Sequence, residues 1–151
     1  MPNFPSLIRA FINDTTHWTE TNPAFVDVEF PQKISKAYLL RSSQIGKCMI
    51  WIDESRGAVT ESQPLGGGLN RAFYDVFCFA RAKSSKEADV EDAEDKAENL
   101  RDQVSTIIKA NWNTLTDAFI MRPQGTYHLT EYNVDPVYFV KVLTVEVFSE
   151  I

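Results

Sequence analysis

Apolar and polar residues follow two clear periods between Leu69 and Ile108, first that of a strand and then that of a helix. The segment Ala72–Arg81 alternates with a period of two and is rich in aromatic residues. Its faces are Tyr74, Val76, Cys78 and Ala80 on one side, and Phe73, Asp75, Phe77, Phe79 and Arg81 on the other. Because both faces are largely apolar, we expect a central strand that is covered on two sides.

The segment Ala88–Ile108 has the period of an amphipathic helix. Ser84 and Glu87 have the spacing of a capping box, in which a hydroxyl and a carboxylate satisfy the first free N–H groups. Burial of one apolar stripe does not offset the entropy lost on ordering such a helix. We therefore expect it to lie on a sheet, with Ala93 and Ala97 close against the phenylalanines of the strand. The stripe consists of Val90, Ala93, Ala97, Leu100, Val104, Ile107 and Ile108.

The remaining apolar runs predict a short N-terminal helix, Pro5–Asn13, and several further strands. The last strand, Val137–Phe148, has one apolar face that only Lys141 interrupts, and we expect its other face to be half exposed. The other predicted strands are Phe25–Phe30, Ala37–Arg41, a central Cys48–Asp53, Ala118–Arg122 ended by Pro123, and Thr126–Tyr132.

The segment Asp53–Leu69 contains turn residues and no apolar period. Loops of this length are uncommon in compact domains and usually functional or disordered. We interpret it as the tip of a long hairpin that joins the Cys48–Asp53 strand to the Ala72–Arg81 strand. The pattern therefore predicts one α+β domain, residues 1–151, with a long hairpin loop at 53–69. Its mostly antiparallel twisted sheet would carry the long helix on one face, beside a short N-terminal helix.

Charge changes this picture at one place. The net charge is −6 at pH 7, and the segment from Ser84 to Asp102 alone contributes −5, from eight acidic and three basic residues. We expect these acidic residues to face away from the sheet. An acidic domain without a basic stripe is a poor candidate for direct binding to nucleic acid.

Candidate chemistry is sparse. His17 and His128 lack the spacing of metal ligands. Cys48 and Cys78 each lie within an apolar strand pattern, so we expect them to be buried, unpaired and unreactive, as in a reducing compartment. Gly66–Gly68 lacks the lysine and hydroxyl residue of a phosphate-binding loop and is interpreted as a hinge. These patterns predict no enzyme, with no catalytic residue, cofactor or metal.

No apolar run approaches the roughly 20 residues of a membrane-spanning helix. The N-terminus lacks the basic region and apolar core of a signal peptide, so we expect none. Instead, aromatic residues are frequent in predicted loops and edge strands. They either pack beneath the loops or act as anchors in a protein–protein interface. These residues are Trp18, Phe25, Phe30, Tyr38, Trp112, Tyr127 and Tyr132.

The order of these elements resembles that of the tail terminator (tail completion) proteins of long-tailed phages. The likeness lies in the N-terminal helix, the long hairpin loop, the Ala72–Arg81 strand with the Ala88–Ile108 helix after it, and the terminal strand Phe139–Val147. It implies a structural virion protein that forms a homohexameric ring at the head-proximal end of the tail tube, ends tube polymerisation and joins the tail to the head. The family has no catalytic residues to transfer to this chain.

The resemblance also implies the partners: further copies of the chain, the tail tube protein, and a head–tail connector or neck protein. DNA would pass through the channel without specific binding, and no membrane would be involved. The protein would be synthesised in the host cytoplasm and reside in the tail or neck of the virion. We expect the 53–69 loop to contact a neighbouring subunit or the tube. The expected interface residues are Arg56, Val59, Glu61, Pro64, Leu65, Trp18, Trp112 and Tyr132.

Two other classes stay open. Another neck or tail-tube protein of the same particle would share the fold and join a different ring. A dimeric α/β domain that binds a small molecule would have an apolar pocket between its helix and its sheet.

Overall fold

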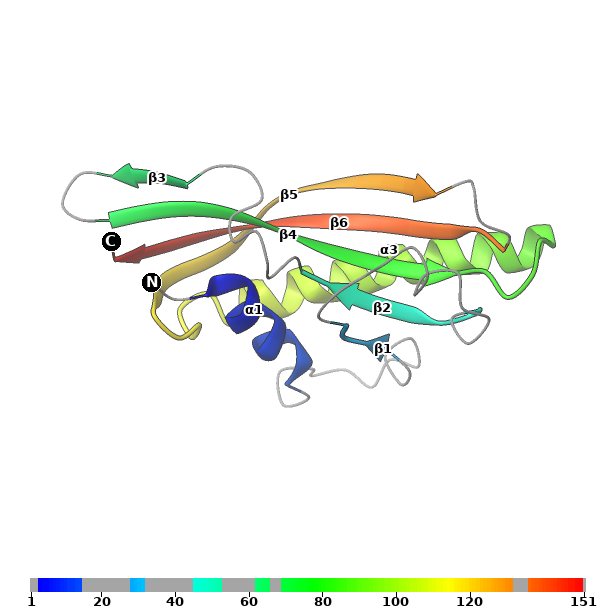
Figure 1. Cartoon of the computed structure of the whole chain (residues 1–151), viewed down its shortest axis with the longest axis horizontal. Helices are drawn as coiled ribbons and strands as arrows, with labels where there is room; N and C mark the ends of the chain where they lie inside the picture. Colours follow the sequence, from blue (N-terminus) through cyan, green and yellow to red (C-terminus); the bar gives the residue numbers. More distant parts are fainter. Residues whose placement is uncertain are drawn as a thin grey trace.

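The structure, a computed structural model, describes residues 3–14, 28–31, 45–52, 62–65, 69–131 and 136–150. Over these ranges the elements are α1 (Phe4–Asn13), β1 (Val28–Glu29), β2 (Cys48–Trp51), β3 (Ser62–Leu65), β4 (Leu69–Arg81), α3 (Glu87–Ala110), β5 (Ala118–Glu131) and β6 (Tyr138–Glu150). The long strands and α3 run along the same long axis of the molecule (Figure 1). No helix in the described ranges is long and apolar enough to cross a membrane.

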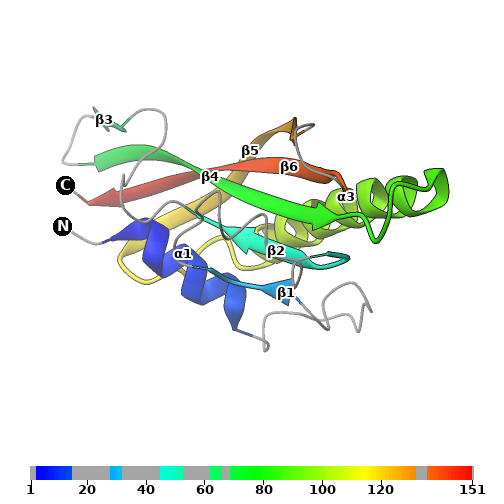
Figure 2. The ribbon, with the colours of Figure 1, turned by 45° about the vertical axis from the view of Figure 1, so that its right-hand side comes forward.

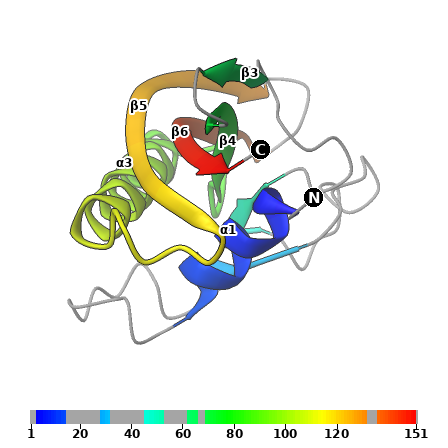
Figure 3. The same cartoon turned by 90° about the vertical axis from the view of Figure 1, so that its left-hand side faces the viewer.

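The strands form one sheet in the order β1-β2-β4-β6-β5, in which only the β1–β2 pair is parallel. β4 pairs with β6 along its whole length, from Leu69↔Glu150 to Arg81↔Tyr138. Its other edge is shared by β3, near Leu69, and β2, near Ala80. The sheet twists, and β5 curves around β6 and β4 when the molecule is viewed end-on (Figure 3). The predicted fold class, α+β with a mostly antiparallel sheet, is confirmed.

Both helices lie on one face of this sheet (Figure 2). Asn3 caps α1, since its side-chain oxygen accepts a hydrogen bond from the N–H of Ser6 at 3.2 Å. Ile8 and Ile12 of α1 share one apolar core with the inward residues of β2, β4, β6 and α3. The predicted stripe of α3 is confirmed, with Val90 at its margin.

One detail of that packing was predicted wrongly. Ala93 and Ala97 share a core with Tyr74, Val76 and Cys78, whereas the phenylalanines of β4 face the other way. The helix-side face of β4 also carries Ala72 and Ala80, and small side chains let a helix approach a sheet closely.

The opposite face of the sheet buries a second cluster, made of Met49, Phe79, Tyr138, Val140 and Val142 with Trp51 and Phe77 at its edge. Both faces of β4 are therefore buried, as predicted. The expected half-exposed face of β6 is wrong, because Tyr138, Val140, Val142 and Glu146 are all buried. β6 lies between β4 and β5, so its side chains have cross-strand neighbours on both sides.

The predicted capping box is also wrong. α3 begins at Glu87, its N-cap residue is Lys86, and no side chain caps it there. Ser84 instead accepts a hydrogen bond from the Lys86 N–H at 3.2 Å and donates one to the carboxylate of Asp89. The Ser84 hydroxyl thus stabilises the turn before the helix, and its hydrogen bond to Asp89 links that turn to the first turn of α3.

The two short strands predicted around Pro123 are one strand, β5, with register shifts at Ala118/Ile120 and Pro123/Gly125. Proline is tolerated at a bulge or on an edge strand, where its missing N–H leaves no ladder bond unmade. Pro123 therefore bends the strand instead of ending it.

β2 and β4 pair antiparallel from Cys48↔Ala80 to Trp51↔Phe77, as the predicted hairpin between these strands requires. β2 lies inside the sheet, between β1 and β4, as predicted. The expected loop contains a strand of its own, β3, which pairs with the first four residues of β4. Residues 53–61 and 66–68 lie outside the described residues, as do 15–27, 32–44 and 132–135, which include the predicted strand Ala37–Arg41.

Candidate assembly surface

A charged network crosses three strands on the sheet face that the helices leave open. Arg71 of β4 and Arg122 of β5 both bind the carboxylate of Glu146 of β6. Arg71 Nε lies 2.7 Å from Oε1, and Arg122 contacts both carboxylate oxygens at 3.3 Å. The strand register brings these three side chains together. Glu146 lies opposite Arg122 on β5 and opposite Phe73 on β4, and Arg71 is two residues from Phe73 on the same face of β4.

Burial differs sharply among these three side chains. The Glu146 side chain is 2% exposed, whereas those of Arg71 and Arg122 are 33% and 57% exposed. Each guanidinium also stacks on an aromatic ring of its own neighbourhood, Arg71 on Phe73 at 4.7 Å and Arg122 on Phe148 at 5.4 Å. Two cations that share one buried anion leave a net positive charge held in a fixed orientation.

One polar pair, Asp75 and Thr144, lies between the arginine–glutamate network and the second apolar cluster. Thr144 donates a hydrogen bond of 2.7 Å from its hydroxyl to the buried carboxylate of Asp75, its cross-strand partner. This face of the sheet thus runs from aromatic and aliphatic side chains near Tyr138, through Asp75 and Thr144, to the arginines.

Large apolar side chains are exposed beside the arginines. Phe119 is 53% exposed and stands at the first register shift of β5, and its neighbour Ile120 lies opposite Phe148. Trp112 is 50% exposed, and its carbonyl accepts a hydrogen bond of 2.7 Å from the N–H of Met121. We define the β5 surface as Arg71, Arg122, Phe119 and Ile120, with Glu146 beneath them and Trp112 at the margin.

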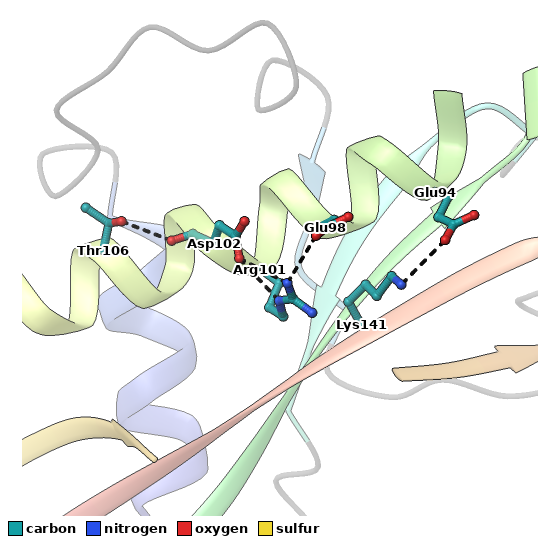
Figure 4. A network of polar contacts seen from close by, with 6 residues as sticks. All are labelled: Glu94, Glu98, Arg101, Asp102, Thr106 and Lys141. Carbon is teal, nitrogen blue, oxygen red and sulfur yellow. Dashed lines mark hydrogen bonds and ion pairs between the residues drawn. The ribbon is translucent and has the colours of Figure 1, made fainter. Parts of the chain in front are cut away.

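The exposed acidic residues of α3 lie on the other side of the molecule, away from the sheet. Lys141 reaches from β6 toward the helix, with its Nζ 3.8 Å from Glu94 Oε1 (Figure 4). Arg101 pairs with Glu98 at 3.7 Å and with Asp102 at 3.2 Å along the helix (Figure 4). The outermost acidic side chains, Glu87, Glu91, Asp92, Asp95, Glu98 and Asp102, are exposed as expected.

Among the interface residues predicted from the sequence, Trp112 is exposed at the margin of the β5 surface. Pro64 and Leu65 belong to β3, which pairs with the start of β4. The remaining ones, Arg56, Val59, Glu61, Trp18 and Tyr132, lie outside the described residues. Of the predicted interface residues, the structure places Trp112 at the margin of this surface.

The other residues of the β5 surface escaped sequence reasoning. Arg122 stands directly before Pro123, so the sequence predicts it at the end of a strand. That prediction gave no indication that Arg122 lies opposite Glu146. A usable signal was present, since Arg71, Arg122 and Glu146 are charged positions within otherwise apolar strands, and such positions need opposite charges as partners.

The two cysteines lie in buried positions within the sheet. Cys48 and Cys78 are buried and form no disulfide, as predicted, and burial raises the pKa of the Cys78 thiol far above its ordinary range. His128 lies in β5 opposite Lys141, and His17 lies outside the described residues. Over the described part of the chain, no three His, Cys, Asp or Glu side chains are grouped in a way that would hold a metal ion.

Comparisons of the sequence with protein-family models and with curated proteins find no match.

Proposed function

We propose that this protein is a structural subunit of a phage tail. It forms a ring at the head-proximal end of the tail tube, ends tube polymerisation and joins the tail to the head. The observation that carries the proposal is the β5 surface, where paired and stacked arginines lie beside exposed Phe119 and Ile120. Arginine and aromatic residues held in place before binding are the usual anchors of protein interfaces.

The order of elements expected from the sequence supports the same proposal, because over about the last 85 residues it resembles that of tail terminator proteins, and in outline before them. The mechanism is geometric. One face of the ring copies the surface of a tube subunit and adds the last layer, and the opposite face accepts no further tube subunit. Contacts between unlike patches on neighbouring copies form a ring when their rotation closes.

The space between α3 and the sheet favours this proposal over a small-molecule pocket. Leu100, Val104 and Ile108 are fully buried there and pack in one cluster with Val76 and Cys78. Side chains thus occupy the position where the alternative required a ligand.

The test is electron microscopy of phage particles made without this chain. The proposal predicts tail tubes longer than normal that fail to join heads. Tubes of normal length that fail to join heads would indicate a neck protein instead, and a complete loss of tubes would indicate the tube subunit. Normal, joined tails would contradict all three assignments.

A further inference from the structure

We infer that the β5 surface of one copy docks on the acidic outer face of α3 in the next copy. This inference rests on the proposed ring and specifies which two patches meet in it. The partner is thus a second copy of this chain, identified by the complementary charge of the two faces.

The first argument is the unused binding capacity of the arginines. Arg71 uses Nε and Arg122 uses Nε and Nη2 to hold Glu146. Their other guanidinium N–H groups make no hydrogen bond or ion pair to the described part of the chain. A guanidinium has five N–H donors in a planar fork that fits a carboxylate, so both residues are able to bind a second anion.

The second argument is the unpaired charge on α3. Glu87, Glu91 and Asp95 recur every four residues and are exposed on one face of the helix. Within the described ranges none of these three has a basic partner, whereas Asp92, Glu98 and Asp102 are paired with Lys96 or Arg101. Like charges four residues apart destabilise a helix, so a cation from outside would relieve this repulsion.

The third argument is the position of the two patches. The α3 helix covers one face of the sheet, and its acidic residues point away from that face. Arg71, Arg122 and Glu146 lie on the opposite face, in register with the second cluster. One molecule therefore cannot join its own patches, and a two-fold dimer cannot join both pairs at once. The contact is heterologous, and repeating it generates a closed ring or an open filament.

The exposed apolar residues complete the surface. Phe119 and Ile120 precede Arg122 on β5, and apolar side chains beside an ion pair exclude water and strengthen it. We expect Arg122 to contribute most, since it is the more exposed of the two arginines.

A charge swap tests the inference. The association of the purified chain is measured by sedimentation velocity at low and high salt for the native protein and for Arg122→Gln, Arg122→Glu and Asp95→Arg. We expect each single variant to weaken association at least about tenfold. The double variant Arg122→Glu with Asp95→Arg should recover most of it. Lys47→Glu, an exposed residue outside both patches, makes the same charge change as Arg122→Glu and should associate like the native protein.

Thermal unfolding of each variant separates loss of the contact from loss of the fold, and Arg122→Gln avoids placing a second carboxylate beside Glu146. A native chain that stays monomeric at low salt overturns the inference, as does a folded Arg122→Gln that associates normally or a swap that recovers nothing. If rings form and join tails while these variants have no effect, the inference fails and the proposed function stands.

Discussion

Arg71 Nε lies 2.7 Å from the Oε1 atom of Glu146, a carboxylate that is buried between β4 and β5. The pair joins two adjacent strands on the sheet face opposite the helices. Since Glu146 is held by Arg122 as well, one buried anion fixes two partly exposed cations. The arrangement orders the β5 surface before any partner binds.

The two arginines should differ in their effect on stability. Arg71→Met removes the shorter and less exposed contact, and we expect it to lower the free energy of unfolding by about 2 kcal/mol or more. Arg122→Met removes a contact of a more exposed side chain, and we expect a loss below about 1 kcal/mol. Urea denaturation measures both. Equal losses would show that Glu146 does not depend chiefly on Arg71.

Packing under α3 gives a second prediction with a matched control. Ala97 is fully buried against the sheet, whereas its neighbour Glu98 is exposed on the same helix. Overpacking makes Ala97→Leu destabilising by about 1–3 kcal/mol, while Glu98→Leu should change stability by less than about 1 kcal/mol. The measurement is the midpoint of chemical unfolding. Similar midpoints for the two leucine variants would mean that α3 does not approach the sheet as described.

Alkaline pH should destabilise the fold. Burial raises the pKa of the Cys78 thiol above its ordinary 9.0 and raises the pKa of Tyr74 above 10.0. The unfolded chain then loses these protons at lower pH than the folded chain. Stability is fully present below about pH 9 and falls above it, by up to about 1.4 kcal/mol per pH unit for the thiol.

Urea denaturation between pH 8 and pH 10.5 checks this, with Cys78→Ala as the comparison. The alanine variant should lose less stability over that range, because its thiol no longer titrates. A native protein whose stability stays constant or rises above pH 9 would show that the thiol is accessible to water.

Sequence periodicity was sufficient for β4 and α3, because each buries one face whose residues are close together in the chain. Val76 and Cys78 on the strand and Leu100 and Val104 on the helix point inward as their spacing predicts. Periodicity failed where the outcome depends on a partner distant in sequence. Glu146 is a polar position on its own strand, and only the pairing with β4 and β5 shows that two arginines bury it.

Local signals were also overruled by the sheet. Pro123 predicted the end of a strand, but β5 continues past it through a bulge on the outer side of β6. Ser84 and Glu87 had the spacing of a capping box, yet the helix starts at Glu87 itself. The length of β5 and the start of α3 depend on packing against segments distant in the sequence. A short local motif carries no information about that packing.

The hairpin that contains β3 gives a prediction about assembly. We expect deletion of residues 61–67 to prevent ring formation, because this segment belongs to the loop that is expected to contact a neighbouring subunit or the tube. The chain should stay folded, because β3 pairs only with the first four residues of β4 in the described structure. Native mass spectrometry reports the assembly and circular dichroism the fold. A deletion variant that still forms rings and still joins tails would exclude this segment from the interface.

The most direct measurement of the central claim is electron microscopy of the purified chain, combined with its native mass. The account predicts ring-shaped particles, with a mass near 103 kDa if six copies of the 17.2 kDa chain close the ring. A compact dimer with a bound small molecule, under the conditions that favour assembly, would contradict it.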